Sequence, residues 1–484
     1  MASGRVVRVH EAAAGVAAET LRQGIRDIQA ELGVTPDFPA EVADAAARAA
    51  EAPRLPDLDR TDLPFVTIDP PSARDLDQAV HLGRDGDGYV VHYAIADVAA
   101  FVSPGDAVDA EAHRRGETLY GADSKVPLHP PVLSEGAASL LPDQVRPALL
   151  WTIRLDAAGE RTDVRVERTL VRSREQLDYE TVQAAIDAGT AAEPLQLLKE
   201  VGERRLRLEA ARGGVALPLP EQEVEIDGDD WRLEFRSLVP AEEWNAQISL
   251  LTGIAAASLM VGARVGLLRT LPPPDPRDVR RLQRTAGALG IDWPDGTAYP
   301  NFIRSLDPSQ PRHAAMVVAC TRLLRGSGYA AFDGALPEQT RHSALAAEYA
   351  HVTAPLRRLG DRYTGEVCLA ICAGTVVPDW VRQRLPGLPR TLRESGTRSG
   401  RYQRAVVDLV EAGVLHHRVG ETFAAVVIDV AENGGGRRGV VTLQEDGVEA
   451  PVVSADPLPL GDAVSVRLTT ADVERRKVEF TLDR

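Results

Sequence analysis

The spacing of apolar residues changes twice along the chain. Residues 17–32 and 41–52 carry apolar side chains at helical spacing. Just after them the pattern changes to short apolar runs separated by Gly and Asp, which predict strands at 65–68, 79–82 and 89–93. We therefore expect a helical N-terminal region over residues 1–60, followed by the start of a sheet.

Longer segments in the middle of the chain repeat apolar residues every three or four positions, which predicts helices packed on that sheet. These segments are 179–188, 194–212, 242–265, 277–289, 314–324 and 355–373. Beyond residue 420 the pattern returns to five short strands, which indicates a small OB-type barrel. The expected fold class is α+β, with a large domain of mixed sheet and packed helices at 61–418 and the barrel at 419–484.

Composition indicates the compartment more than the fold. At 484 residues and 44% hydrophobic content, the chain is long enough for two or three domains, and its three cysteines are too few for a disulfide framework. Residues 1–20 contain no apolar core of a signal peptide, and the apolar run 248–268 contains Ser, Thr, Gly and Arg without flanking basic clusters. We interpret that run as a buried helix and expect a cytoplasmic monomer that does not bind membranes.

The formal net charge of −16 argues against broad electrostatic binding of nucleic acid. The charge is uneven, because residues 382–404 contain seven arginines and a single acid, Glu394. That segment is either a solvated helix face or a basic stripe for nucleic acid, and the sequence favours neither interpretation. Only three of the 55 basic residues are lysine.

Three aspartates lie within nine residues, at Asp69, Asp75 and Asp77. On an extended strand Asp75 and Asp77 leave the same face, and a Pro-Pro turn can bring Asp69 back towards them. Like charges this close destabilise one another unless a cation lies between them, and Mg²⁺ prefers carboxylate oxygens. The pattern therefore predicts a metal site, with an ordinary surface turn capped by Asp as the alternative.

A second polar motif lies at residues 348–361. Thr353 as N-cap and Pro355 in the first turn predict a helix that runs to about Gly374. Arg357 and Arg358 would then lie at the positive end of the helix dipole, a conflict that a bound phosphate would remove. The alternative is an ion pair within the helix between Arg357 and Asp361.

Two further side chains have a functional and a structural interpretation. Tyr120 ends a charged segment before a loop, where an aromatic ring can either stack on a base or anchor the loop. His351 has no second His or Cys at ligand spacing, so we expect a structural hydrogen bond.

Four motifs together resemble the ribonuclease II / ribonuclease R family of exoribonucleases over about residues 65–484. They are Ile68-Asp69-Pro-Pro-Ser-Ala-Arg-Asp75-Leu-Asp77, His92-Tyr93-Ala-Ile-Ala-Asp97-Val-Ala-Ala-Phe101, Leu133-Ser134 through Ser139-Leu140-Leu141-Pro142, and His351-Val-Thr-Ala-Pro355-Leu-Arg357-Arg358. The resemblance implies hydrolysis of single-stranded RNA from its 3′ end to nucleoside 5′-monophosphates. It also implies Mg²⁺, which Mn²⁺ can replace, at the bottom of a narrow channel.

The resemblance also implies roles for individual residues. Asp69, Asp75 and Asp77 match the family's metal-binding motif, and Asp77 matches its most critical member. Arg357 matches the arginine on the scissile phosphate, so the implied catalytic residues are Asp75, Asp77 and Arg357. The implied RNA-binding residues are Arg357 and the neighbouring Arg358. Three further residues that match family positions are also implied to contact RNA: Tyr120, Glu242 and Glu243.

The sequence departs from the family pattern in several places. Gln78 stands where the motif has a fourth aspartate, so we expect it to offer the metal an amide oxygen without a charge. Gln403 aligns with a family glutamate. Residues 1–60 are too short for the two cold-shock barrels common in the family, and residues 420–484 hold twelve acids against seven bases.

The sequence is therefore compatible with three functions. The leading hypothesis is a magnesium-dependent 3′ to 5′ exoribonuclease acting on single-stranded RNA. The second is an RNA-binding or adaptor protein that kept the fold and lost turnover, which Gln78 and the acidic barrel favour. The third is a metal-dependent DNA phosphoesterase that shares the acidic cluster.

Overall fold

The fold is that of a computed structural model of the 484-residue chain. The structure describes residues 7–9, 16–122, 124–217, 221–227, 230–236, 238–307, 310–431, 435–443 and 448–483. Two closed five-stranded barrels organise these residues, one near each end of a long helix. The predicted α+β class is confirmed.

The first barrel forms the core of the larger part of the chain. Its strands close in the order β2-β3-β4-β7-β8. They are β2 (Phe65–Ile68), β3 (Gln78–Asp85), β4 (Gly88–Ala96), β7 (Val145–Leu155) and β8 (Arg161–Leu177). The sheet predicted at residue 65 thus curls until β2 pairs in parallel with the end of β8. Large aromatic side chains, Tyr89, Tyr93 and Trp151, are fully buried in this region.

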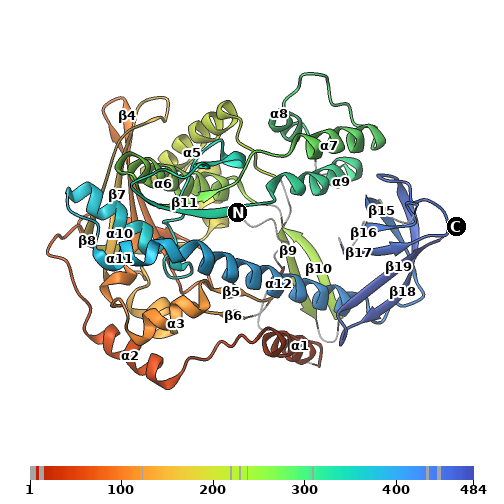
Figure 1. Ribbon diagram of the computed structural model, residues 1–484, viewed down its shortest axis with the longest axis horizontal. Helices are drawn as coiled ribbons and strands as arrows, with labels where there is room; N and C mark the ends of the chain where they lie inside the picture. Colours follow the sequence, from red (N-terminus) through yellow and green to blue (C-terminus); the bar gives the residue numbers. More distant parts are fainter. Residues whose placement is uncertain are drawn as a thin grey trace.

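Helices cover this barrel on several sides (Figure 1). Besides β7 and β8, the α-helices and strands described between β4 and β15 in the sequence are α3 (Ala107–Arg115), β5 (Leu119–Tyr120), β6 (Lys125–Val126), α4 (Tyr179–Asp187), α5 (Glu193–Arg212), β9 (Glu221–Asp227), β10 (Asp230–Arg236), α6 (Pro240–Ala263), β11 (Val265–Thr270), α7 (Pro276–Ala288), α8 (Tyr299–Arg304), α9 (Pro311–Cys320), β12 (Gly328–Asp333), β13 (Arg341–His342), β14 (Ala347–Glu348), α10 (Leu359–Ala373), α11 (Asp379–Arg384) and α12 (Leu388–Leu415).

Helix α6 contains most of the apolar run predicted to be buried. Ile248, Leu251 and Met260 are completely enclosed by neighbouring elements. In the described part of the chain, α6 alone is long and apolar enough to cross a membrane, and half of its most apolar stretch is buried inside the protein. Its apolar character is therefore explained by packing, as predicted.

The second barrel confirms the five strands predicted beyond residue 420. Its strands close in the order β15-β16-β17-β19-β18. They are β15 (Thr422–Val430), β16 (Arg438–Leu443), β17 (Glu449–Val453), β18 (Ala463–Asp472) and β19 (Lys477–Leu482). Phe423 and Phe480 both point into its core, so neither ring is available as an exposed stacking platform. Helix α12 packs against α10 and β12 and extends to this barrel, where it packs on β18 and β19 (Figure 1).

The predicted helical N-terminal region contains α1 (Val16–Leu32) and α2 (Ala40–Glu51), preceded by the short strand β1 (Val7–Val9). Helix α1 packs on α12 and α2 packs on α3. Between them, Arg115 stacks on Phe38 with 3.7 Å between guanidinium carbon and ring centre, and donates hydrogen bonds to the carbonyls of Thr35 and Asp37. The N-terminal region is thus attached to α3 and α12.

Candidate active site

The three predicted acids lie on the connection between β2 and β3. Asp69 directly follows β2, and Asp75 and Asp77 precede β3, which begins at Gln78. Asp75 and Asp77 therefore lie just before the strand and not on it, so the extended strand that the expectation assumed begins only at Gln78. Instead the segment is pinned by hydrogen bonds: Leu76 N–H donates to Ser139 Oγ at 2.9 Å, and the carbonyl of Asp77 accepts from Ala96 N–H at 2.9 Å.

Asp77 is the most deeply buried of the three, with 1% of its side chain exposed. Its Oδ1 accepts the N–H of Leu356 at 2.8 Å, and its Oδ2 lies 3.2 Å from Nε of Arg357 without an aligned hydrogen-bond donor. Burial raises the pKa of Asp77 to about 7 against the opposing effect of Arg357. Asp77 therefore remains short of countercharge even beside an arginine.

Asp69 shares that electrostatic environment. Burial raises its pKa to about 7 as well, Arg357 opposes the rise, and the charge of Asp75 adds to it. Asp75 acts in the same way on Asp77. One arginine thus faces a group of mutually repelling carboxylates.

The turn before α10 differs from the prediction. The helix begins at Leu359 and not near Pro355, although it ends at Ala373 with Gly374 as its C-cap, as expected. The reason is Asp361, whose Oδ2 accepts the N–H of Ala354 at 2.8 Å and pairs with Arg358 at 2.7 Å. These bonds close residues 354–358 into a turn that cannot join the helix.

This turn also corrects the expected partners of the two arginines. The intrahelical pair predicted between Arg357 and Asp361 is replaced by Arg358–Asp361. Arg357 lies before the helix and faces Asp77, so the anion at this turn is a carboxylate of the protein. With 43% of its side chain exposed, Arg357 can still contact a second anion.

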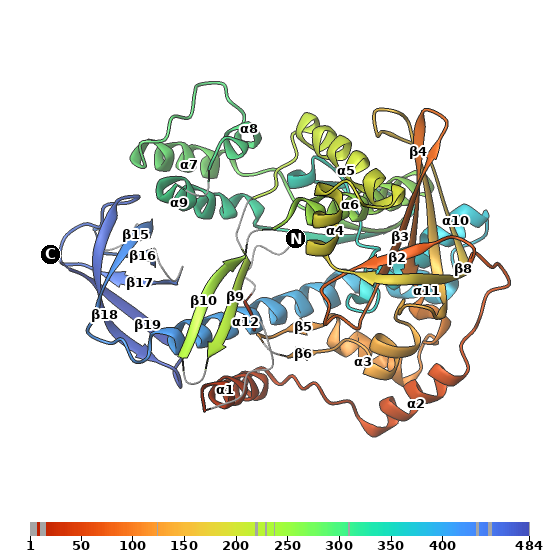
Figure 2. The same ribbon diagram turned by 180° about the vertical axis from the view of Figure 1, so that it is seen from behind.

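Tyr120 approaches the same group from a two-strand ladder. It ends β5, and its cross-strand partner is Lys125 of β6. Burial lowers the pKa of Arg357, but its interactions with Asp77 and with the phenol of Tyr120 raise it, and the net change is a rise. The phenol therefore lies close to the guanidinium. Tyr120 is 38% exposed, which leaves ring surface for a ligand. Figure 2 shows β5 and β6 beside α12.

The structure adds Lys125 and Glu135, which the sequence did not single out. The Nζ of Lys125 lies 2.8 Å from Asp75 Oδ1 and 2.9 Å from Glu135 Oε1. Asp75 is thus engaged by a lysine while Asp77 is engaged by an arginine. The available signal was that Lys125, one of only three lysines, follows Tyr120 by five positions.

The acidic pair that begins α6 has two different environments. Glu242 Oε1 accepts the N–H of Val239 at 3.2 Å, whereas Glu243 is exposed. Glu242 and Asp69 both act on Tyr179, whose pKa rises to about 12, mainly through burial. Tyr179 accepts a hydrogen bond from Asn245 at 3.1 Å and so joins the second turn of α6 to the acidic group.

Gln78 begins β3, and its amide nitrogen donates to the carbonyl of Thr353. An aspartate at this position could not make that bond, because a carboxylate has no donor. Gln78 therefore ties β3 to the turn that carries Arg357. Its role as a metal ligand stays a prediction.

The acidic group meets the chemical requirements of Mg²⁺ in part. Among the described residues no three His, Cys, Asp or Glu side chains are gathered tightly enough to form a metal cage. Mg²⁺ seldom needs one, since it is usually held by one or two carboxylates together with waters and substrate phosphates. The buried Oδ2 of Asp77 without a hydrogen-bond donor and the raised pKa of Asp69 fit a divalent cation at those two residues.

Other predicted features lie outside the acidic group. His351 accepts or donates one structural hydrogen bond, between its Nδ1 and the hydroxyl of Tyr329 at 2.9 Å, as expected. All three cysteines are free thiols. Gln403 lies half-buried on α12. Its correspondence to the family glutamate stays a prediction.

The arginine-rich segment 382–404 is partly structural. Arg390 pairs with Glu394 at 2.8 Å, Arg382 pairs with Asp333 at 3.2 Å, and Arg398 donates to the carbonyl of Arg114 at 3.1 Å. The solvated-face interpretation thus explains part of the stripe.

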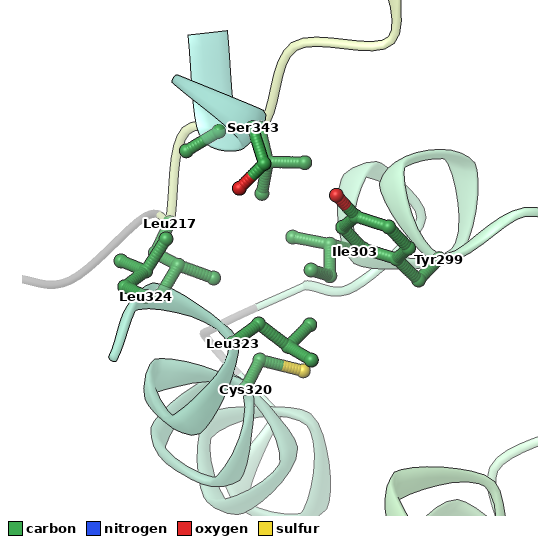
Figure 3. Close-up of a pocket in the computed structure, with 9 residues that line it drawn as sticks. Leu217, Tyr299, Ile303, Cys320, Leu323, Leu324 and Ser343 are labelled. Atoms are coloured by element: carbon green, nitrogen blue, oxygen red, sulfur yellow. The ribbon is translucent and has the colours of Figure 1, made fainter. Parts of the chain in front are cut away.

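A separate pocket lies beside α8 and α9 (Figure 3). Its lining is mainly apolar and includes Leu217, Ile303, Cys320 and Leu323, with the ring of Tyr299 on one side. It contains no carboxylate or basic side chain, so it does not extend the acidic group.

Comparison of the sequence with known proteins identifies the family of this chain. Residues 58–370 match the model of the RNB domain, and residues 421–483 match the RNase II-type exonuclease C-terminal S1 domain. Ribonuclease R of Escherichia coli is 26% identical over an alignment that covers 91% of this chain and 59% of that protein. The chain thus spans less than two thirds of the length of that relative.

Solved structures agree on the fold. RNase R of Mycoplasma genitalium, in complex with ribose-methylated single-stranded RNA, superimposes with a TM-score of 0.84 at 19% identity, covering 96% of this chain and 78% of that one. Yeast Ssd1, described as a pseudonuclease, superimposes with a TM-score of 0.68 at 16% identity, covering 92% and 57%. Since the RNB model matches more than half of the sequence, the chain belongs to the RNB-domain exoribonuclease family.

Proposed function

We propose that this protein is a Mg²⁺-dependent 3′ to 5′ exoribonuclease that hydrolyses single-stranded RNA to nucleoside 5′-monophosphates. The observation that carries the proposal is the position of Asp77 between the N–H of Leu356 and the guanidinium of Arg357, with Asp69 and Asp75 in the same electrostatic environment. A purely structural ion pair needs no additional carboxylates around it.

Arg357, Tyr120 and the aspartates would have different roles in hydrolysis. Arg357 is held by Asp77 on one side and is open on the other, so it can bind the scissile phosphate and stabilise its developing charge. Tyr120 lies against Arg357 and offers its exposed ring to the terminal base. A bound divalent cation would supply a water of lowered pKa and neutralise charge on the phosphate. Asp69 and Asp77 would hold it.

A second candidate is an RNA-binding protein without turnover. Two observations favour it: Lys125 engages Asp75, and Gln78 uses its amide to hold the Thr353 carbonyl. Yeast Ssd1 demonstrates that the fold occurs in a pseudonuclease. This candidate predicts retention of RNA without cleavage.

The test is incubation of the protein with 5′-end-labelled single-stranded RNA and with a DNA of the same sequence. We expect a ladder of 3′-shortened RNA products with Mg²⁺, none with EDTA, and no ladder from DNA. Asp77→Asn should abolish the ladder, whereas Asp295→Asn, a matched change at an exposed acid on the loop before α8, should preserve it. RNA that is bound and left intact would select the second candidate, and cleavage of the DNA would select a DNA phosphoesterase.

A further inference from the structure

Lys125 forms ion pairs with two carboxylates in and beside the proposed active site. In the two-residue ladder of β5 and β6, Tyr120 and Lys125 are directly opposite one another. Opposed residues on paired strands send their side chains to the same face of the ladder. Lys125 therefore shares the face of Tyr120, and its Nζ reaches Asp75 at 2.8 Å and Glu135 at 2.9 Å.

The choice of lysine is unusual for this chain, which uses arginine for nearly all of its basic residues. The other two lysines have peripheral roles: Lys199 lies over the ring of Trp244 at 5.6 Å, and Lys477 pairs with Glu479 on the second barrel. An ammonium is a compact point charge, whereas a guanidinium is a wide planar fork. At Asp75 the chain therefore places the side chain that most resembles a small cation.

The charges around Lys125 indicate how many metal ions the site accepts. Four carboxylates, those of Asp69, Asp75, Asp77 and Glu135, face the two cations Lys125 and Arg357. Two negative charges remain, which a single divalent ion neutralises. A second ion would leave excess positive charge and would compete with Lys125 for Asp75.

We propose that the ammonium of Lys125 takes the place of a second divalent ion, so that the site binds one metal and not two. The inference rests on the proposed function, because it assumes that Asp69 and Asp77 hold the first ion. Two-metal sites place charge on both the attacking and the leaving oxygen. Here Lys125 fixes Asp75 and supplies the second positive charge as part of the protein.

The experiment counts Mn²⁺ bound to the full chain in the absence of RNA, by equilibrium dialysis with electron paramagnetic resonance of the free ion. We expect one tightly bound Mn²⁺ in the wild type and two in Lys125→Met, which removes the charge and keeps the length of the side chain. Lys125→Arg restores the charge and should bind one. Lys477→Met is the matched control for loss of a lysine, and it should also bind one.

A second variant keeps the inference testable if Lys125→Met does not fold. With Lys125 in place, Asp75 is not a ligand of the first ion, so Asp75→Asn should still bind one Mn²⁺ with an affinity within about threefold of the wild type. Two ions in the wild type, an unchanged count in Lys125→Met, or loss of binding in Asp75→Asn would each overturn the inference. Failure of the proposed function has a different signature: a wild type that binds no Mn²⁺ and leaves RNA intact.

Discussion

Arg357 and Arg358 are adjacent in the sequence, and each pairs with a buried aspartate, yet the two pairs are built differently. Asp361 receives the N–H of Ala354 and two N–H groups of Arg358 on one oxygen. Asp77 receives only the N–H of Leu356, and Arg357 stands 3.2 Å away without forming a hydrogen bond. Arg357 is also more exposed than Arg358, at 43% against 26%.

The difference separates structure from function within one turn. Arg358–Asp361 closes the turn and sets where α10 begins, and its guanidinium donates two hydrogen bonds to the carboxylate. Oδ1 of Asp361 has no hydrogen-bond partner, as is also true of Oδ2 of Asp77, so the pairs differ mainly in the bonding and exposure of the arginine. In the Arg357–Asp77 pair, both partners can still bind another group: the guanidinium is half-exposed, and burial raises the pKa of the carboxylate to about 7. Charged groups that are not fully satisfied at a buried ion pair indicate a binding site for a ligand.

The two arginines should therefore respond in opposite ways to removal of their charge. Arg357→Met should lower kcat by roughly 10²–10³-fold, the range for loss of one preorganised group on a developing charge, with little change in stability. Arg358→Met should lower the free energy of unfolding by about 3 kcal/mol, because it strands the buried Asp361, and leave the rate per folded molecule within a few fold.

Single-turnover RNA hydrolysis and urea denaturation check both variants. A comparable loss of stability in the two variants would remove the distinction between the pairs.

The raised pKa values predict how metal binding depends on pH. For Asp69 and Asp77 the pKa is about 7 in the folded protein against an ordinary value of 3.8. Without metal, their contribution to stability is complete below pH 3.8 and is lost as the pH rises through about 7. Mg²⁺ competes with those protons, so it should stabilise the fold at pH 8 and have little effect at pH 5.5.

At saturating Mg²⁺ the stabilisation should reach about 2–3 kcal/mol, as expected at roughly one hundred times the dissociation constant. Thermal unfolding with and without Mg²⁺ at both pH values measures it. Asp77→Asn should lose the pH 8 effect, and an equal Mg²⁺ effect at pH 5.5 and pH 8 would contradict the raised pKa values.

The smallest effect is expected at Gln78, which links β3 to the turn. Gln78→Asp should cost about 1 kcal/mol of stability, because the carboxylate cannot donate to the Thr353 carbonyl. It should also raise the Mg²⁺ affinity several fold by adding a charge. Gln78→Asn keeps an amide and serves as the control. Unchanged Mg²⁺ affinity in Gln78→Asp would show that residue 78 does not face the metal.

Much of the fold follows from local patterns. Residue spacing predicted three of the five strands of the first barrel, all five strands of the second and many of the surrounding helices. It did not predict β7, β8 or the long helix α12. The closure of β2 on β8 could not be predicted in this way, because it depends on pairing across more than a hundred residues. The division at residues 60 and 418 stays a prediction.

The candidate site was predictable in location and less so in detail. The crowding of Asp69, Asp75 and Asp77 identified the acidic group without a structure. The start of α10 was predicted wrongly, because capping rules weigh Thr353 and Pro355 and cannot weigh a carboxylate at Asp361 that binds back to Ala354. Lys125 was missed because its partner Asp75 lies fifty positions away in the sequence.

The most direct measurement compares Asp77→Asn with Asp361→Asn for RNA hydrolysis per folded molecule and for the midpoint of urea unfolding. Both changes remove one buried charge beside one arginine and keep the shape of the side chain. We predict that Asp77→Asn loses hydrolysis and unfolds at the wild-type midpoint, whereas Asp361→Asn hydrolyses RNA at near the wild-type rate and unfolds at lower urea. Hydrolysis by Asp77→Asn at the wild-type rate would contradict the account.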